Sequence, residues 1–173
     1  PATVILGDHP VPGSSSFAAG DAALKFVSQL TSDDLLVCLI SGGGSALLTS
    51  PAASITLADV QTVTTALLAC GASINEMNAV RKHIDQVKGG GLARWAAPAR
   101  VAALILSDVI GDPLDVIASG PTVPDPTTYA HALAVIERYG LGEQVPGSIR
   151  QHLRRGGPGS VDEPTKLGDP ELA

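Results

Sequence analysis

The sequence predicts an α/β protein of the three-layer α/β/α, Rossmann-like class, with a mostly parallel sheet. Short apolar runs, typical of buried strands, alternate with longer segments whose apolar residues recur at helical spacing. One apolar run leads directly into a glycine-rich turn at 41–45, and another leads directly into a Ser-Asp pair at 107–108. Ligands bind beyond the carboxyl ends of parallel strands, so we expect the functional site where these runs end.

The composition sets limits on size and partners. The chain has 173 residues, the size of one domain, and 45% of them are hydrophobic. The net charge of -6 argues against a nucleic-acid partner and against a polybasic membrane binder. Cys38 and Cys70 fit buried thiols, and no apolar run reaches the length of a membrane span. We therefore expect no membrane partner and a cytoplasmic location.

The first third of the chain predicts a strand, a helix and a second strand. Residues 2–6 are apolar and β-branched, residues 14–16 offer a helix N-cap, and that helix runs to about residue 30. A buried strand over 35–40 leads into the turn Ser41, Gly42, Gly43, Gly44 and Ser45. Such a turn before a helix presents backbone N–H groups to phosphate. The alternative is a tight turn without a ligand.

The middle of the chain predicts two helices and a second glycine-rich turn. An amphipathic helix covers 56–69, and Ser73 with Glu76 forms a capping box at the start of the next helix. Asn78, Arg81 and Lys82 follow at a spacing that puts them on one helix face. Lys88 then opens a glycine run over 89–91. Either these cations bind an anion, or they are ordinary solvated charges.

The stretch 101–128 is the part of the sequence around which we expect the site to form. Residues 101–106 predict a strand covered on both faces, followed at once by Asp108. A carboxylate there can hold magnesium or orient a hydroxyl group. Proline-stiffened turns follow at 119–122 and 124–128. Asp108 and Asp125 have the alternative role of helix caps. Helices over 130–139 and 144–153 and a linker-like tail over 156–173 complete the prediction.

Together these residues suit phosphoryl transfer. Glycine turns and the cations Arg81, Lys82 and Lys88 suit phosphates, and carboxylates such as Asp108 suit the accompanying magnesium ion. Phosphoryl transfer depends mainly on positioning and charge neutralisation.

Five strings carry a resemblance to a known family. They are DHPVP, ISGGGSALL, INEMNAVRKHI, VKGGGLA and LILSDVIGDPLDVIASGPTVPDPTT. In this order they resemble the glycerate 2-kinase family, whose second domain is called MOFRL. The resemblance implies transfer of the ATP γ-phosphate, with magnesium, to the 2-hydroxyl of D-glycerate. It also implies that residues 1–155 form most of an N-terminal domain, that 156–173 form its tail, and that the MOFRL domain is not part of this chain. The sequence does not determine the oligomeric state, and a homodimer is one alternative.

The resemblance also implies roles for single residues. It makes Asp108, Arg81 and Lys88 catalytic, with Asp108 as the metal ligand. The residues it assigns to the nucleotide and its phosphates are Ser41, Gly42, Gly43, Gly44, Ser45, Asn78, Ser119, Gly120, Thr122 and Asp125. Two positions depart from the family pattern, because Gly91 replaces a common arginine and Asp85 a common serine.

Two other functions stay open at this point. Some relatives of the family are labelled hydroxypyruvate reductase, which predicts NAD(P)H binding, although the GxGxxG fingerprint is absent from the sequence. The other alternative is a non-catalytic fragment that binds phosphate ligands.

Overall fold

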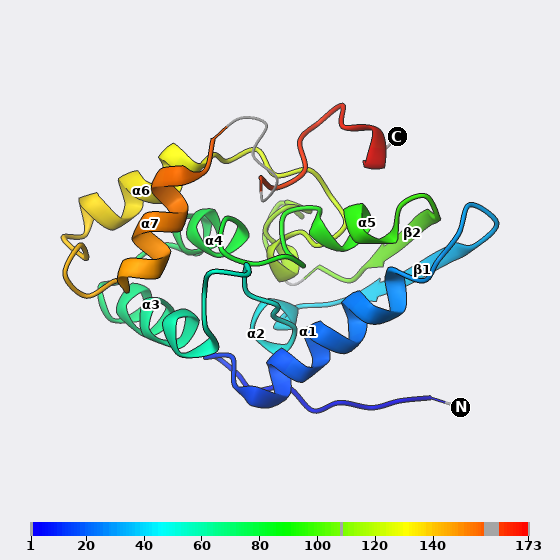
Figure 1. Cartoon of the computed structure of the whole chain (residues 1–173), viewed down its shortest axis with the longest axis horizontal. Coiled ribbons are helices and arrows are strands. Elements are labelled where there is room, and N and C mark those ends of the chain that lie inside the picture. Colours follow the sequence, from blue (N-terminus) through cyan, green and yellow to red (C-terminus); the bar gives the residue numbers. More distant parts are fainter. Residues whose placement is uncertain (1, 108, 158–162, 173) are drawn as a thin grey trace.

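The computed structural model describes residues 2–107, 109–157 and 163–172 (Figure 1). The longer helices are α1 (Ser14–Val27), α3 (Leu57–Ala69), α4 (Ile74–Lys82), α6 (Tyr129–Arg138) and α7 (Gly147–Arg155). The short ones are α2 (Gly44–Leu47), α5 (Gly91–Ala96), η1 (Ile117–Ser119) and η2 (Pro170–Leu172). The strands are β1 (Leu35–Ile40) and β2 (Arg100–Ile105).

The two strands pair in parallel, with Leu35 opposite Arg100 and Ile40 opposite Ile105. The predicted α/β class and parallel sheet are therefore confirmed. A small apolar core lies between the sheet and helices α1 and α5 (Figure 1). Its buried members are Val27, Cys38, Val87, Leu92 and Ala96. This core anchors the carboxyl end of β1, where the glycine-rich turn begins.

The predicted strands over 35–40 and 101–106 are both present, but the expectation that they are buried is wrong, and a third predicted strand does not form. Leu39 of β1 is 78% exposed and Leu104 of β2 is 64% exposed, so neither strand is covered on both faces. Residues 2–6 form no strand, and Val4 and Leu6 are each 80% exposed. A strand needs the backbone groups of a neighbour to pair with. In the described part of the chain the sheet offers only β1 and β2, which pair with each other.

Helices α3, α4, α6 and α7 build a second, larger core. Leu67, Val80, Ile149 and Leu153 are fully buried in it. The expected helix starts are confirmed where a local cap specifies them. Ser73 and Glu76 form the capping box of α4, because the Ser73 hydroxyl accepts from Glu76 N and the Glu76 carboxylate accepts from Ser73 N at 2.9 Å. This cap fixes where α4 begins, and α4 carries two of the three cations predicted to suit phosphate, Arg81 and Lys82.

The segment 163–172, which we expected to be part of a linker-like tail, packs against the body of the protein. Thr165 is 2% exposed. Its N–H donates to Gly89 O at 2.9 Å, and its carbonyl accepts from Asp125 N at 2.8 Å. The segment thus joins the second glycine-rich turn to the loop at 124–128. None of the helices in the described residues has the length and apolarity needed to cross a membrane.

Candidate functional site

A cavity of about 300 Å³ lies beyond the carboxyl end of β1. We call it the Arg81 cavity. It brings together five of the predicted site residues: Gly42, Gly43, Ser45, Asn78 and Arg81. His9 and the η1 segment complete its polar and apolar walls. The expectation that the site forms where a strand ends is consistent with this placement.

Arg81 is the group in this cavity that is free to bind an anion. It lies in the last turn of α4, half-buried, and forms no hydrogen bond or ion pair with another described residue. Burial lowers the pKa of Arg81, and the charge of Asp85 partly offsets that effect. A guanidinium stays protonated in proteins and presents five N–H donors. Arg81 can therefore hold a carboxylate or phosphate through two parallel hydrogen bonds.

The turn between β1 and α2 is shaped by glycine. Gly43 has φ +81°, and a Cβ on Gly44 would lie 2.8 Å from Cβ of Ala118 in η1. The backbone of Gly44 therefore packs directly against the side chain of Ala118. Helix α2 has only four residues, so its dipole adds little to anion binding. Ser41, predicted as a phosphate contact, is exposed and lies outside the Arg81 cavity.

A chain of three polar side chains fixes the wall of the cavity. The Ser119 hydroxyl donates to Asn78 Oδ1 at 2.8 Å, so the hydroxyl of Ser45, 2.7 Å away, must donate to Ser119. Asn78 Nδ2 in turn donates to Val116 O at 3.1 Å. Ser119 and Asn78 are both buried. The hydrogen-bonding capacity of Asn78 is therefore largely used inside the protein. Ser45 lines the cavity, and its hydroxyl oxygen keeps lone pairs that can accept a hydrogen bond.

The same wall carries backbone strain. Ala118 and Ser119 have φ values of +51° and +62°, in the left-handed region that glycine favours. Such residues cost on the order of 1–3 kcal/mol each and persist where the surroundings hold them. The hydrogen bonds of Ser119 to Ser45 and Asn78 are what hold them here. This pattern is typical of functional sites.

Lys88 lies beneath the cavity rather than in it. It is 4% exposed, and its Nζ donates to Asp85 Oδ2 at 2.8 Å and to Leu48 O at 3.0 Å. Burial lowers the pKa of Lys88, whereas Asp85 raises it. Among the described residues Arg81 and Lys88 have one neighbouring carboxylate, that of Asp85, so these three groups together carry one net positive charge. Sequence reasoning noted Asp85 only as a departure from a pattern, although its i,i+3 spacing from Lys88 was a signal for the pair.

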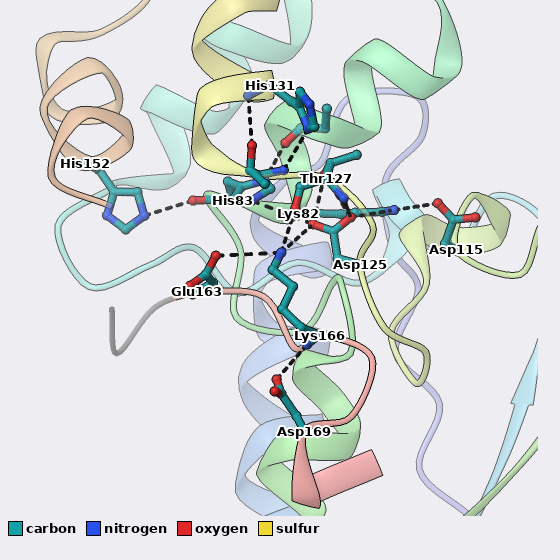
Figure 2. Close-up of polar contacts among 12 residues, drawn as sticks. Lys82, His83, Asp115, Asp125, Thr127, His131, His152, Glu163, Lys166 and Asp169 are labelled. Carbon is teal, nitrogen blue, oxygen red and sulfur yellow. Dashed lines mark hydrogen bonds and ion pairs between the residues drawn. The ribbon is translucent and has the colours of Figure 1, made fainter. Parts of the chain in front are cut away.

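Lys82 lies in a largely buried ionic network with Asp115 and Asp125 (Figure 2). Its Nζ lies 3.0 Å from Asp115 Oδ2 and 3.2 Å from Asp125 Oδ1. The side chains of Lys82 and Asp125 are at most 1% exposed. Arg81 and Lys82, predicted to share a helix face, therefore serve different surroundings: Arg81 lines the cavity, whereas Lys82 belongs to the ionic network. Asp125, predicted to contact nucleotide, pairs with Lys82, and its Oδ1 accepts a hydrogen bond from Thr127 N at 3.0 Å.

His83 is the neutral member of this network. Its Nδ1 donates to Ala79 O at 2.7 Å, and its Nε2 lies 3.7 Å from Asp125 Oδ2. Burial lowers the pKa of His83 to about 4, so the imidazole is uncharged at neutral pH. Lys166 from the docked segment reaches the same region and donates to Thr127 O at 2.6 Å (Figure 2). The network holds the loop at 124–128 between α4 and the segment 163–169.

The remaining predicted residues lie elsewhere. Gly120 is buried, with φ +59° and its carbonyl accepting from Gly90 N at 2.7 Å. Thr122 lines another cavity, with Arg100 and Pro170. Asp108, predicted as catalytic and as the metal ligand, lies outside the described residues. Across the residues that are described, no group of three histidine, cysteine or carboxylate side chains has a metal-binding arrangement.

Comparisons with known proteins give the family. The sequence matches the family described as "Domain of unknown function (DUF4147)" over residues 1–154. The chain belongs to this family. It is 52% identical over 153 residues to a protein of Agrobacterium vitis named "Putative hydroxypyruvate reductase", covering 88% of this chain and 34% of the relative. It is 46% identical over 169 residues to "Glycerate 2-kinase" of Pyrococcus horikoshii, covering 98% of this chain and 38% of the relative.

A solved structure agrees. The crystal structure of glycerate kinase from Thermotoga maritima matches with a TM-score of 0.81 and 44% sequence identity, over 92% of this chain and 36% of that one. The resemblance to the glycerate kinases is confirmed by these relatives. The chain spans only about a third of the two curated relatives named above, 34% and 38% of their lengths.

Proposed function

We propose that this chain forms the anion-binding part of an ATP-dependent kinase that phosphorylates the 2-hydroxyl of D-glycerate to give 2-phosphoglycerate. The observation that carries the proposal is the half-buried guanidinium of Arg81, unpaired among the described residues, in a cavity walled by a glycine turn. The names of the relatives from Pyrococcus and Thermotoga support the same reaction.

In this reaction the 2-hydroxyl loses its proton to solvent and its oxygen bonds to the γ-phosphorus. The bond from that phosphorus to the β–γ bridging oxygen breaks, and ADP leaves with this oxygen. The enzyme mainly positions the reactants and neutralises charge. Arg81 binds one anionic group, either the carboxylate of glycerate or a phosphate of ATP. Lys88 and Asp85 lie behind it and set the net positive charge of the site. The Ser45–Ser119–Asn78 chain holds the glycine turn in place.

Magnesium and the remaining site residues stay predictions. The family implies a magnesium ion that neutralises phosphate charge, but its predicted ligand Asp108 lies outside the described residues. The described residues show no cluster that fits such an ion. We therefore assign no step to it. The MOFRL domain, the homodimer and the cytoplasmic location likewise stay predictions.

The direct test uses the whole protein that contains this chain. It is incubated with magnesium, ATP and D-glycerate, and the product is identified by phosphorus NMR. We expect 2-phosphoglycerate. Formation of 3-phosphoglycerate would correct the acceptor position, and no phosphorylated product from folded protein would refute the kinase.

The Arg81→Met variant tests the role of Arg81. Loss of a charge-assisted, paired hydrogen bond should lower kcat/KM by about 10- to 100-fold. The substrate whose KM rises identifies the anionic group that Arg81 binds. Arg155→Met, an exposed arginine at the end of α7, is the matched control and should leave both KM values unchanged. Equal kinetics in the two variants would remove Arg81 from the site.

The second candidate is an NAD(P)H-dependent hydroxypyruvate reductase, favoured by the name of the Agrobacterium relative. It is tested by following NADH and NADPH oxidation in the presence of hydroxypyruvate. We expect none, because the sequence lacks the GxGxxG fingerprint of dinucleotide binding. Turnover there, without glycerate phosphorylation, would reverse the order of the two candidates.

A further inference from the structure

A second, much smaller cavity lies beneath the Arg81 cavity, between α3, the end of α2 and the turn before α5. We call it the Thr64 chamber. Its volume is about 10 Å³, and its polar lining consists of Ser45, Thr49, Thr64, Arg81, Asp85 and Lys88. Arg81 and Ser45 line both this chamber and the Arg81 cavity. Whatever occupies the chamber therefore acts on a residue of the proposed site.

Thr64 is the unsatisfied group in this chamber. It is 1% exposed, and its Oγ1 is buried without a hydrogen-bond partner among the described residues. A buried hydroxyl left unpaired costs about 1–3 kcal/mol. Thr62 on the same helix does not share this problem, because its exposed hydroxyl donates to Ala58 O at 2.8 Å. The difference lies in the chamber and not in the helix.

The other polar groups around the chamber offer partners for one small molecule. Lys88 Nζ has three hydrogens, of which two are directed to Asp85 and Leu48. Arg81 forms no hydrogen bond or ion pair within the described residues, so its N–H groups remain available. A buried water needs two to four polar partners and a cavity of roughly 10–15 Å³. The chamber meets both conditions.

We propose that the Thr64 chamber binds a single ordered water molecule, which links Thr64 Oγ1 to the N–H donors of Arg81 and Lys88. Thr64 is then a positioning residue, because it acts on Arg81 through this water and touches no substrate. The effect on Arg81 rests on the proposed function, whereas the water site itself does not.

The first test is a high-resolution crystal structure of the whole protein and of two variants. We expect a water in the chamber within about 3.2 Å of Thr64 Oγ1, a distance typical of hydrogen bonds. Thr64→Ser keeps the hydroxyl and should keep the water, whereas Thr64→Val replaces the hydroxyl with a methyl group and should lose it. A chamber without density in the wild type overturns the proposal. Halide density, checked by a bromide soak, also overturns it in favour of an anion site.

The second test separates positioning from folding. Thr64→Val should raise the KM of the substrate that Arg81 binds by about three- to tenfold, the effect of one hydrogen bond, with kcat within about twofold. Thr64→Ser should stay near the wild type, and Thr62→Val is the control on the same helix. An unchanged KM in Thr64→Val overturns the positioning role.

Both tests can be carried out, and can fail, whether or not the proposed kinase activity is correct. If the protein does not phosphorylate glycerate, inorganic phosphate replaces the substrates, and its affinity is measured by calorimetry in the same variants. A weaker affinity in Thr64→Val than in Thr64→Ser then supports the positioning role, and equal affinities overturn it. The crystallographic test of the water needs no activity.

Discussion

Two Lys–Asp pairs with similar separations between their charged atoms differ strongly in burial. Lys88 and Asp85 are 2.8 Å apart, with side chains 4% and 3% exposed. Lys25 and Asp21 are 2.6 Å apart, with side chains 72% and 49% exposed. Breaking a buried pair leaves a charge without solvent or partner, whereas an exposed pair contributes little. The buried pair should therefore dominate the stability of this region.

The Asp85→Asn variant tests this difference. It should lower the free energy of unfolding by about 3–5 kcal/mol, because the ammonium of Lys88 loses its counter-charge inside the protein. Asp21→Asn is the control and should cost less than about 1 kcal/mol. Both values come from urea unfolding of the whole protein. Equal losses would show that Lys88 is better solvated than its burial indicates.

The sequence indicates which side chains have the chemistry to bind an anion, but it does not show which of them line a cavity and which are buried. Residue type and spacing predict anion binding by Arg81 and by the turn at 41–45, and Gly42, Gly43 and Ser45 of this turn meet Arg81 in one cavity. The same pattern predicts the same role for Lys88. Its burial depends on Leu48 and Asp85, and the Leu48 contact comes from a distant segment of the chain. No local pattern distinguishes a cation that lines a cavity from one that lies beneath it.

At the scale of elements, the start of α5 depends on a close backbone approach. A Cβ on Gly91, the first residue of α5, would lie 2.1 Å from Gln86 O, far inside any allowed contact. The obstacle is backbone, so no side chain can move aside. Gly142 has an ordinary φ, and a Cβ added there would have nothing within 4 Å. An added methyl group would therefore clash with backbone at Gly91 and would meet open space at Gly142.

Gly91→Ala should therefore destabilise the protein by about 1–3 kcal/mol, because the turn at 88–91 must shift to admit the methyl group. Gly142→Ala should be neutral or stabilise by about 0.4–1 kcal/mol, because it restricts only the unfolded chain. The urea concentrations at the midpoints of unfolding of the two variants and the wild type measure both effects. A tolerated Gly91→Ala would mean that this turn is more adaptable than its packing indicates.

Helix boundaries were better predicted than strands, for a physical reason. Thr56, Ser73 and Thr128 cap their helices through side chains three residues away, so the signal is contained in the local sequence. A strand is completed by a partner that can lie anywhere in the chain. Residues 2–6 have the composition of a strand, but composition does not supply a partner.

At the scale of the whole molecule, His83 couples folding to pH. Its imidazole faces Asp125, rests edge-on against Tyr129 at 4.6 Å between ring centroids, and is fully buried. Lys166 opposes its protonation, whereas Asp125 and Glu163 favour it. Burial outweighs these charges and lowers the pKa of His83 from its ordinary value of 6.5 to about 4. Folding therefore requires a neutral imidazole.

The sign of the effect follows from proton binding. Above pH 6.5 His83 is largely neutral in both the folded and the unfolded state. Between pH 6.5 and about 4 the unfolded chain takes up a proton that the folded protein excludes, so acidification favours unfolding. Stability should fall by on the order of 2–3 kcal/mol across this window. Carboxylates whose pKa is lowered by folding, such as Glu76, lose their stabilising effect at pH values below this window.

The His83→Gln variant separates this contribution from the rest of the molecule. Gln carries no titrating proton, so the slope of unfolding free energy against pH between about 6.5 and 4.5 should flatten, although the variant is less stable at neutral pH. His131→Gln removes an exposed histidine from the first turn of α6 and should leave the slope unchanged. An unchanged slope in His83→Gln would mean that the buried network admits the proton. In that case Asp125 would hold an imidazolium in addition to Lys82 and Lys166, whose Nζ atoms already lie 3.2 and 3.8 Å from its carboxylate oxygens.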